Sequence, residues 1–266
     1  MTYSCRVMVV GFVSCVLGGM MSTAAGAGVA DQRFETRVFQ TEHGSLPYRL
    51  LRPNDYDASR QYPLVIFFHG AGERGVDNVK QLVHGMNDFA SDDVMAKYPC
   101  FVIAPQCPDG EQWVDTPWSA DSHNMSAKPT VPMRLSLELI TSLQSEFSID
   151  ASRLYVTGLS MGGFGVWDVI QRYPNRFAAA VPVCGGGDPA FAKPLRHTPI
   201  WAFHGDADTA VKPIRSRDMI AALKAAGGSP KYTEYPDVGH NSWSATYANR
   251  EMYAWLFAQK RATGDE

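Results

Sequence analysis

The sequence predicts an α/β protein with one mostly parallel, doubly wound sheet and helices on both of its faces. Short apolar runs that suit buried strands alternate along the chain with longer segments of helical periodicity. Several of these runs end directly in glycine-containing turns, as strands do at the carboxyl edge of such a sheet. A length of 266 residues fits one domain, because α/β folds often run this long around a single sheet.

The first expected elements are strands, and helices alternate with strands after them. Residues 33–40 and 48–52 are typical of an antiparallel pair around a turn at His43-Gly44, and buried strands follow at 63–68 and 100–104. The later strands are expected at 153–157, 178–183, 198–203 and 230–235, and the helices at 132–147, 161–173, 213–226 and 243–259. The loops after the parallel strands should therefore converge at one edge of the sheet.

A serine between glycines follows the expected strand at 153–157, in the hexapeptide Gly158-Leu159-Ser160-Met161-Gly162-Gly163. A sharp, strained turn from strand to helix would lift the Ser160 hydroxyl out of the sheet, which is the geometry that a nucleophile needs. Glycine-rich turns after strands are common, so the meaning of this motif depends on its surroundings. Three further segments supply those surroundings.

The first segment is the turn after the strand at 63–68, which reads His69-Gly70-Ala71-Gly72-Glu73-Arg74. Its glycines can leave backbone N–H groups exposed at the carboxyl end of the strand. We expect the N–H of Ala71, together with the N–H of Met161, to hold a developing oxyanion, with Gly72 as the alternative to Ala71. Glu73 and Arg74 either brace this loop or contact a polar substrate.

The second and third segments supply an acid and a base. Asp208 lies past the turn that follows the strand at 198–203, whereas Asp206 suits the turn itself, since Asp side chains readily bond their own backbone. His240 stands in a short loop between the last strand and the terminal helix. Ser160, Asp208 and His240 thus occur in the chain order of a triad on such a sheet, as nucleophile, acid and general base.

These segments together resemble the α/β-hydrolase superfamily from about Phe34 to the end of the chain. The stretches YPLVIFFHGAGERGVDN (62–78) and YPCFVIAPQCP (98–108) are more narrowly similar to small secreted or periplasmic carboxylesterases. Those enzymes are related to polyhydroxybutyrate depolymerases and feruloyl esterases, and some are labelled predicted peptidases. The resemblance implies an α/β-hydrolase fold and the roles given above for the triad and the oxyanion hole. Glu73 and Arg74 depart from the typical depolymerase signature, which leaves the polymer substrate open.

The sequence therefore predicts a serine carboxylesterase that acts on carbohydrate-linked, aryl or short acyl esters and needs no cofactor or metal. A serine peptidase of the same fold would use the same groups, and a non-catalytic carbohydrate-binding protein could keep the fold. Trp113 and Trp118 lie in the long loop at 106–132. We expect them to stack on the substrate, with anchoring of the loop as the alternative role.

The first 27 residues have the pattern of an export signal. Arg6 precedes the apolar run at 7–17, and Ala25-Gly26-Ala27 resembles a cleavage site, so cleavage is expected near residues 27–30 and the catalytic domain at 31–266. The apolar run is short for a membrane span, which needs about 20 residues. We expect a secreted or periplasmic protein with no stable membrane insertion after cleavage, and an uncleaved anchor is the alternative.

Charge and cysteine content indicate which binding partners, metal sites and disulfides to expect. The net charge of −3 is small and basic residues do not cluster, so nucleic acid is not an expected partner. No His/Cys/Asp/Glu cluster has metal-ligand spacing. Cys100, Cys107 and Cys184 remain after the signal, and we expect buried free thiols, because Cys100 and Cys107 bracket a strand too long for a disulfide. The sequence does not indicate the oligomeric state.

Overall fold

The structure is a computed structural model, and it describes residues 29–261. The expected signal at 1–27 lies outside these residues. The strands form one sheet in the order β1-β2-β4-β3-β5-β6-β7-β8. They are β1 (Glu35–Thr41), β2 (Gly44–Leu51), β3 (Tyr62–Phe68), β4 (Phe101–Pro105), β5 (Ile149–Leu159), β6 (Ala179–Val183), β7 (Trp201–Gly205) and β8 (Lys231–Tyr235). The pairs β1–β2 and β2–β4 are antiparallel and the other neighbours are parallel, which confirms the predicted architecture.

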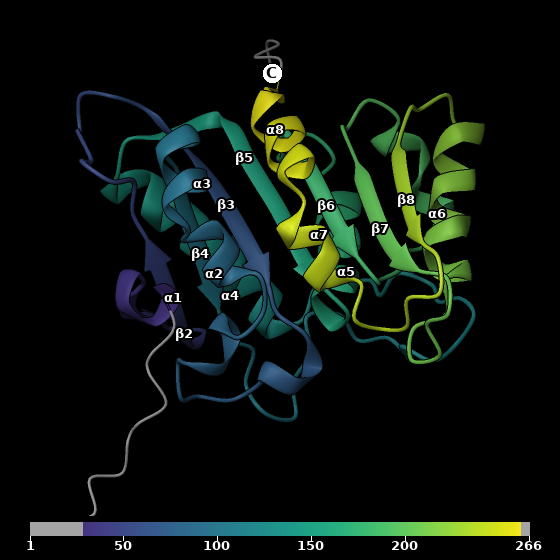
Figure 1. Cartoon of the computed structure of the whole chain (residues 1–266). Helices are drawn as coiled ribbons and strands as arrows, with labels where there is room; N and C mark the ends of the chain where they lie inside the picture. Colours follow the sequence, from purple (N-terminus) through teal and green to yellow (C-terminus); the bar gives the residue numbers. More distant parts are fainter. Residues whose placement is uncertain (1–28, 262–266) are drawn as a thin grey trace, which may run out of the picture.

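Helices cover both faces of this sheet. They are α1 (Val29–Arg33), α2 (Met86–Phe89), α3 (Asp92–Lys97), α4 (Val131–Glu146), α5 (Met161–Arg172), α6 (Ile214–Ala225), α7 (Trp243–Ala248) and α8 (Arg250–Ala258). Short 3-10 turns are η1 (Ala71–Glu73), η2 (Lys80–Leu82), η3 (Pro189–Phe191) and η4 (Lys193–Leu195). In Figure 1, α2, α3, α7 and α8 lie in front of the sheet, and α4 and α5 lie behind it.

Each face of the sheet has its own apolar core. Successive side chains of a strand point to opposite faces, so Leu64 and Ile66 of β3 join the core under α4 and α5, while Val65 and Phe67 join the core under α2, α7 and α8. All seven residues of β3 are buried. The continuous apolar run that predicted this strand is therefore explained by burial on both sides.

Two features of the fold differ from the prediction. The closing helix, expected as one element at 243–259, is broken into α7 and α8 at Asn249. The backbone of Asn249 is extended, and its side-chain oxygen accepts a hydrogen bond from the N–H of Glu251 at 2.9 Å, so this residue caps a new helix. The segment between β3 and β4 contains η1, η2, α2 and α3, for which no helix was expected.

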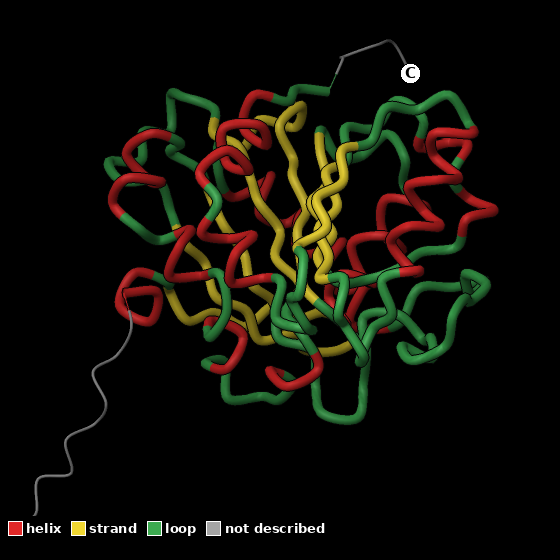
Figure 2. Tube along the Cα trace, turned by 45° about the vertical axis from the view of Figure 1, so that its right-hand side comes forward, coloured by secondary structure: helices red, strands yellow, loops and turns green. Residues whose placement is uncertain are grey.

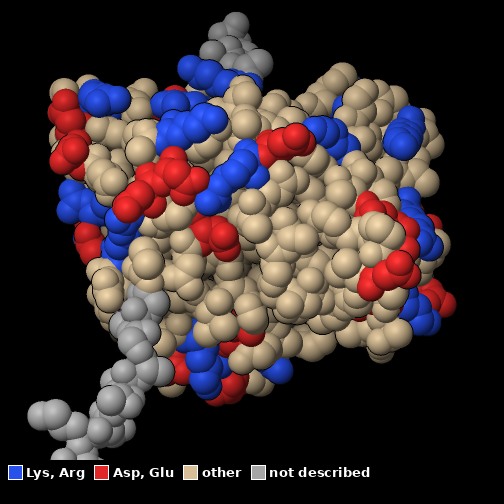
Figure 3. Space-filling view, in the orientation of Figure 1, with Lys and Arg blue, Asp and Glu red and all other residues tan. Residues whose placement is uncertain are grey.

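The loops that follow the parallel strands gather at one end of the sheet, as predicted. Figure 2 shows them as green segments beneath the yellow strands. On the face seen in Figure 3, acidic and basic side chains are interspersed over the surface. Among residues 29–261, no helix has both the length and the apolar character that a membrane crossing requires.

Candidate active site

Ser160 stands in a strained turn between the end of β5 and the start of α5. Its φ is 53° and its ψ is −118°, a conformation that non-glycine residues seldom adopt. The flanking glycines allow the turn because the end of β3 passes very close. A Cβ atom at Gly162 would lie 1.9 Å from the carbonyl oxygen of Phe68, and one at Gly158 would lie 2.5 Å from the same oxygen. The Gly-x-Ser-x-Gly pattern thus corresponds to a real steric requirement.

The three residues proposed from the sequence as a triad lie within hydrogen-bond distance of one another. The His240 Nε2 atom is 2.9 Å from the Ser160 Oγ atom, and the His240 Nδ1 atom is 2.7 Å from the Asp208 Oδ2 atom. A carboxylate can only accept, so Nδ1 carries the proton. The Nε2 atom of the neutral ring is then free to accept the proton of the serine hydroxyl.

Asp208 is held in its charged form by its surroundings. Its side chain has no exposed surface. Its Oδ1 atom accepts hydrogen bonds from the N–H groups of Ala210 (2.9 Å) and Val211 (3.0 Å). Burial alone would raise the pKa of Asp208, but hydrogen bonds from His204, His240 and the Val211 N–H outweigh it and hold this pKa well below its usual range.

His204 makes a contact with the acid that the sequence reading missed. This histidine is buried, with Nδ1 2.8 Å from Ser216 Oγ and Nε2 2.8 Å from the Val211 carbonyl oxygen. The same Nε2 atom lies 3.3 Å from Asp208 Oδ2. The sequence held one sign of this contact, namely a histidine four residues before the acid.

The loop after β3 offers unpaired backbone donors near the serine. The Arg74 Nε–H group donates to the carbonyl oxygen of Ala71 at 2.8 Å, so Arg74 braces the loop. Within the part of the chain that the structure describes, the N–H groups of Ala71, Gly72 and Met161 have no hydrogen-bond acceptor. Such free donors suit an oxyanion hole, and both Ala71 and Gly72 remain candidates for its first donor.

His69 fixes the start of this loop. Its Nδ1 atom is 2.6 Å from the carbonyl oxygen of Gly70, and its Nε2 atom accepts the N–H of Cys107 at 2.9 Å. Both ring nitrogens are therefore satisfied by a neutral imidazole. Burial lowers the pKa of His69 to about 4, which keeps the ring neutral.

The expected role of Trp113 in substrate binding is wrong. Its side chain is fully buried, its ring packs 4.8 Å from the ring of Phe68, and its Nε1–H group donates to the carbonyl oxygen of His69 at 3.0 Å. Trp113 anchors the long loop against the core instead. Trp118 is half-buried, and its ring lies 5.8 Å from the guanidinium carbon of Arg74. A substrate contact for Trp118 stays a prediction.

Cys184 contacts the backbone of Ser160, which the sequence did not indicate. The N–H of Ser160 points at the Val183 carbonyl oxygen (3.0 Å) and at the Cys184 Sγ atom (3.3 Å). Burial raises the pKa of Cys184 to about 12, so the thiol stays protonated and unreactive. Cys100, Cys107 and Cys184 are all free and buried.

One group of possible metal ligands occurs among residues 29–261, namely Cys184, Asp208 and His240, with donor atoms within 4.8 Å of one another. Asp208 and His240 are hydrogen-bonded to each other at 2.7 Å, and this contact accounts for their place in the group.

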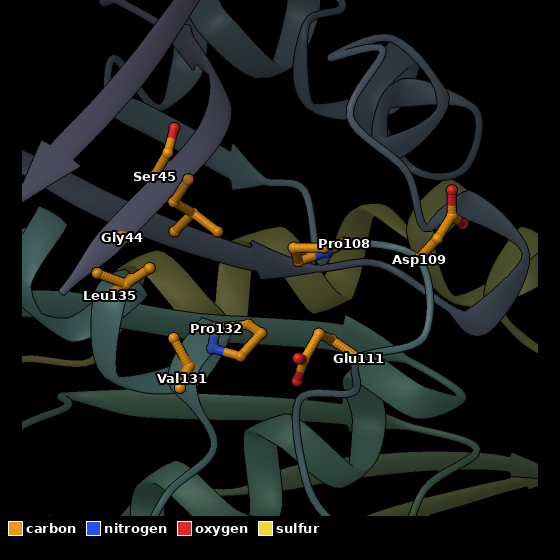
Figure 4. Close-up of a pocket in the computed structure, with 9 residues that line it drawn as sticks. Gly44, Ser45, Pro108, Asp109, Glu111, Val131, Pro132 and Leu135 are labelled. Carbon is orange, nitrogen blue, oxygen red and sulfur yellow. The ribbon is translucent and has the colours of Figure 1, made fainter.

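A cavity of about 220 Å³ lies between the start of β2, the loop after β4 and the start of α4. Its walls do not include Ser160, Asp208 or His240. Figure 4 shows Val131, Pro132 and Leu135 on one side and the carboxylate of Glu111 beside Pro132. The backbone carbonyl oxygen of Glu111 accepts a hydrogen bond from Arg74 at 3.4 Å, so Glu111 both lines this cavity and contacts the loop after β3.

Comparisons with known proteins concern the family and the fold of this chain. A solved structure of a thermostable esterase is 38% identical, with a TM-score of 0.79, and the match covers 86% of this chain and 64% of that chain. A ferulic acid esterase structure superposes with a TM-score of 0.65 over 85% of this chain and 98% of that chain, at 17% identity, and so supports the fold alone. A bifunctional acetylxylan esterase/xylanase from Neocallimastix patriciarum is 32% identical over 124 residues, which are 44% of this chain and 17% of that enzyme.

The chain thus spans less than two thirds of the thermostable esterase and about a sixth of the bifunctional enzyme. The sequence model of the Esterase family matches residues 43–261, which include every residue of the site described above. The protein is a member of this esterase family and has the α/β-hydrolase fold.

Proposed function

We propose that the protein is a serine carboxylesterase that works through an acyl-enzyme on Ser160. The continuous hydrogen-bonded path from Asp208 through His240 to the Ser160 hydroxyl carries this proposal. A serine hydroxyl is a weak nucleophile until an adjacent base takes its proton, and His240 is placed to do so.

Acylation follows from the geometry. His240 Nε2 takes the hydroxyl proton while Ser160 Oγ attacks the ester carbonyl carbon, and the carbonyl oxygen becomes an oxyanion. The N–H of Met161, with that of Ala71 or Gly72, would donate to this oxyanion. The C–O bond of the ester then breaks, and the leaving alcohol receives the proton from His240. Asp208 stays ionised throughout and stabilises the imidazolium.

Deacylation repeats these steps with water. His240 takes a proton from water, the hydroxide attacks the acyl carbon, and Ser160 leaves with the proton that His240 returns. The products are a carboxylic acid and the enzyme in its starting state. No redox group or metal is needed to balance the reaction.

The Ser160→Ala variant tests this proposal directly. Wild-type protein should hydrolyse 4-nitrophenyl acetate and should be labelled covalently by an organophosphate. The Ser160→Ala variant should not be labelled, and its turnover should fall by a factor of about 10⁴ or more, because the nucleophile is lost. A wild-type protein that neither turns over the ester nor takes the label would refute the assignment.

A serine peptidase is the second candidate, because it would use the same side chains. An ester carbonyl is attacked more easily than an amide carbonyl, and an alcohol is a better leaving group than an amine. The relative rates on ester and peptide substrates therefore test the choice. Turnover of short acyl esters should exceed that of small peptides carrying the same acyl group. Faster peptide hydrolysis would favour the peptidase.

We also propose that the protein is exported to the periplasm or the medium and that residues 1–27 are removed. The positive residue, apolar run and Ala-x-Ala pattern support this proposal. Expression of the full chain in a bacterium and N-terminal sequencing of the exported protein should give a start between residues 28 and 31. A full-length chain that stays with the membrane would point to an uncleaved anchor.

A further inference from the structure

We propose that Glu73 selects the alcohol part of the substrate by accepting hydrogen bonds from its hydroxyl groups. The preferred substrates are then esters of polyhydroxy alcohols such as sugars. This inference rests on the proposed esterase function and adds to it the residue that distinguishes one leaving alcohol from another.

Glu73 lies next to the nucleophile, on the loop that carries the oxyanion donors. A Cβ atom built on Gly70 would lie 2.9 Å from the Glu73 Oε2 atom and 3.7 Å from the Ser160 Cβ atom. The Glu73 carboxylate and Ser160 therefore lie close together, and the Leu159 Cδ1 atom lies 2.8 Å from the same point. A substrate whose carbonyl carbon sits at Ser160 must place a neighbouring group close to Glu73.

The carboxylate accepts no hydrogen bond that explains its position. Its side chain is 13% exposed. Among the residues from 29 to 261, none donates a hydrogen bond to it, and its ion-pair contact is with His84, whose Nε2 atom lies 3.6 Å from Oε1, beyond hydrogen-bond length. Bracing of the loop, the other role considered for this pair of residues, belongs to Arg74.

A carboxylate in this place has acceptor sites that the protein leaves open. A largely buried carboxylate without hydrogen-bond donors loses hydration that the 3.6 Å contact with His84 replaces only in part. A negative charge beside the forming oxyanion also opposes the transition state. Hydroxyl donors on the substrate relieve both costs, whereas a substrate with a carboxylate there would increase them.

An aromatic ring beside His84 fits the same class of ligand. Trp243, at the start of α7, is partly exposed, and its ring centroid lies 5.2 Å from that of His84 and 5.2 Å from that of His240. Sugars have apolar faces edged with hydroxyls, so a site that recognises them combines an aromatic surface with hydrogen-bond acceptors. Trp243, His84 and Glu73 form such a combination beside the catalytic base.

The test compares three acetate esters on the wild type and on Glu73→Gln. Acetylated methyl xyloside has hydroxyls on its leaving alcohol, cyclohexyl acetate has a ring of similar size without them, and 4-nitrophenyl acetate reports the basal chemistry. All three give the same acetyl-enzyme, so differences in kcat/KM come from the leaving group. Glu42→Gln, an exposed change of the same charge in the β1–β2 turn, serves as the control.

The wild type should prefer the xyloside ester to cyclohexyl acetate by about 10-fold or more, the value expected for a hydrogen bond to a charged group. Glu73→Gln should lose most of this preference, because its kcat/KM for the xyloside ester should fall more than its kcat/KM for cyclohexyl acetate. Glu42→Gln should retain the wild-type preference. An equal loss on all three esters in Glu73→Gln, or a wild type without the preference, would overturn the inference.

Inhibition of the wild type gives an independent measurement that does not depend on folding of the variant. Methyl xyloside should inhibit hydrolysis of 4-nitrophenyl acetate at lower concentrations than cyclohexanol does, and stronger inhibition by cyclohexanol would count against Glu73. Failure of the esterase proposal itself looks different, because the wild type would then hydrolyse none of the esters and Ser160 would resist the organophosphate.

Discussion

At the scale of single residues, Asp206 and Asp208 stand in the same turn after β7 but have different surroundings. Asp206 is exposed, and its Oδ1 atom accepts the N–H of Asp237 at 2.7 Å, which ties the loops after β7 and β8 together. Asp208 is buried and bonds His240. The sequence predicted Asp208 as the acid and Asp206 as a turn residue, because Asp208 falls past the turn. It did not predict that His204 would support Asp208 from the other side.

Replacement of Asp208 by Asn should lower kcat for ester hydrolysis by a factor of about 10⁴, because the amide no longer fixes the productive tautomer of His240. Asp206→Asn is the matched control. It changes one charge in the same turn and should cost about 1 kcal/mol of stability with no comparable loss of kcat. Rates on 4-nitrophenyl acetate and thermal melting of both variants check this. Similar kcat values for the two variants would argue against Asp208 as the acid.

At the scale of elements, the tight crossing of α5 over the end of β3 determines which residues the turn at Ser160 can hold. Alanine is a better helix former than glycine by roughly 0.5–1 kcal/mol, so helix propensity alone would favour Gly162→Ala. The new Cβ atom would lie 1.9 Å from the Phe68 carbonyl oxygen, however, and backbone must move to admit it.

We therefore expect Gly162→Ala to lower the free energy of unfolding by about 3 kcal/mol, since overpacking of a rigid site typically costs this much, and to abolish ester turnover. Gly239→Ala is the control for stability, because a Cβ atom there meets nothing within 4 Å. Its unfolding free energy should stay within about 0.5 kcal/mol of the wild type. Urea unfolding of the three proteins measures both effects. Equal stability of Gly162→Ala and wild type would show that the crossing is not rigid.

Elements with a strong periodic pattern were predictable, and the loops between them were not. The buried strand β3 and the helices α4, α5 and α6 begin and end within one residue of their expected limits. Hydrophobic periodicity is a local signal, so it survives without knowledge of the tertiary structure. The path of the loop at 106–130 depends on long-range packing, and the role expected of Trp113 was therefore wrong. The break at Asn249 was also missed, because an apolar pattern continues across it.

At the scale of the whole molecule, the order of strands in the sheet decides which loops meet. Ser160 and His240 are 80 residues apart and follow β5 and β8, yet their side chains touch because the parallel strands end at the same edge. The chain order of the three residues made their meeting predictable. The positions of Cys184, Glu73 and His84 around them were not, since no local pattern links these residues before the chain folds.

We expect the same packing to make the stability of the protein sensitive to acid through His69. Its neutral ring donates through Nδ1 to the Gly70 carbonyl oxygen and accepts the Cys107 N–H at Nε2. A second proton on Nε2 would point at that N–H group and break the bond. Burial thus lowers the pKa of His69 to about 4, whereas histidine in an unfolded chain titrates near 6.5. Burial beside Arg215 likewise lowers the pKa of His123 to about 4.

Between pH 6.5 and 4 the unfolded chain binds a proton at residue 69 that the folded protein excludes, so the free energy of unfolding should fall as the pH falls. The pKa of His69 in the folded protein, about 4, and in the unfolded chain, about 6.5, differ enough for His69 to contribute about 3 kcal/mol to this loss of stability. His69→Gln, whose amide can keep one donor and one acceptor, should be less stable at pH 7 but should lose less stability on acidification. His123→Gln should reduce the pH dependence by a smaller amount, because that ring is only half-buried. Urea unfolding of the three proteins at pH 7, 5.5 and 4 measures how the free energy of unfolding changes with pH. If this change in His69→Gln equals that of the wild type, His69 is not the source of the acid sensitivity.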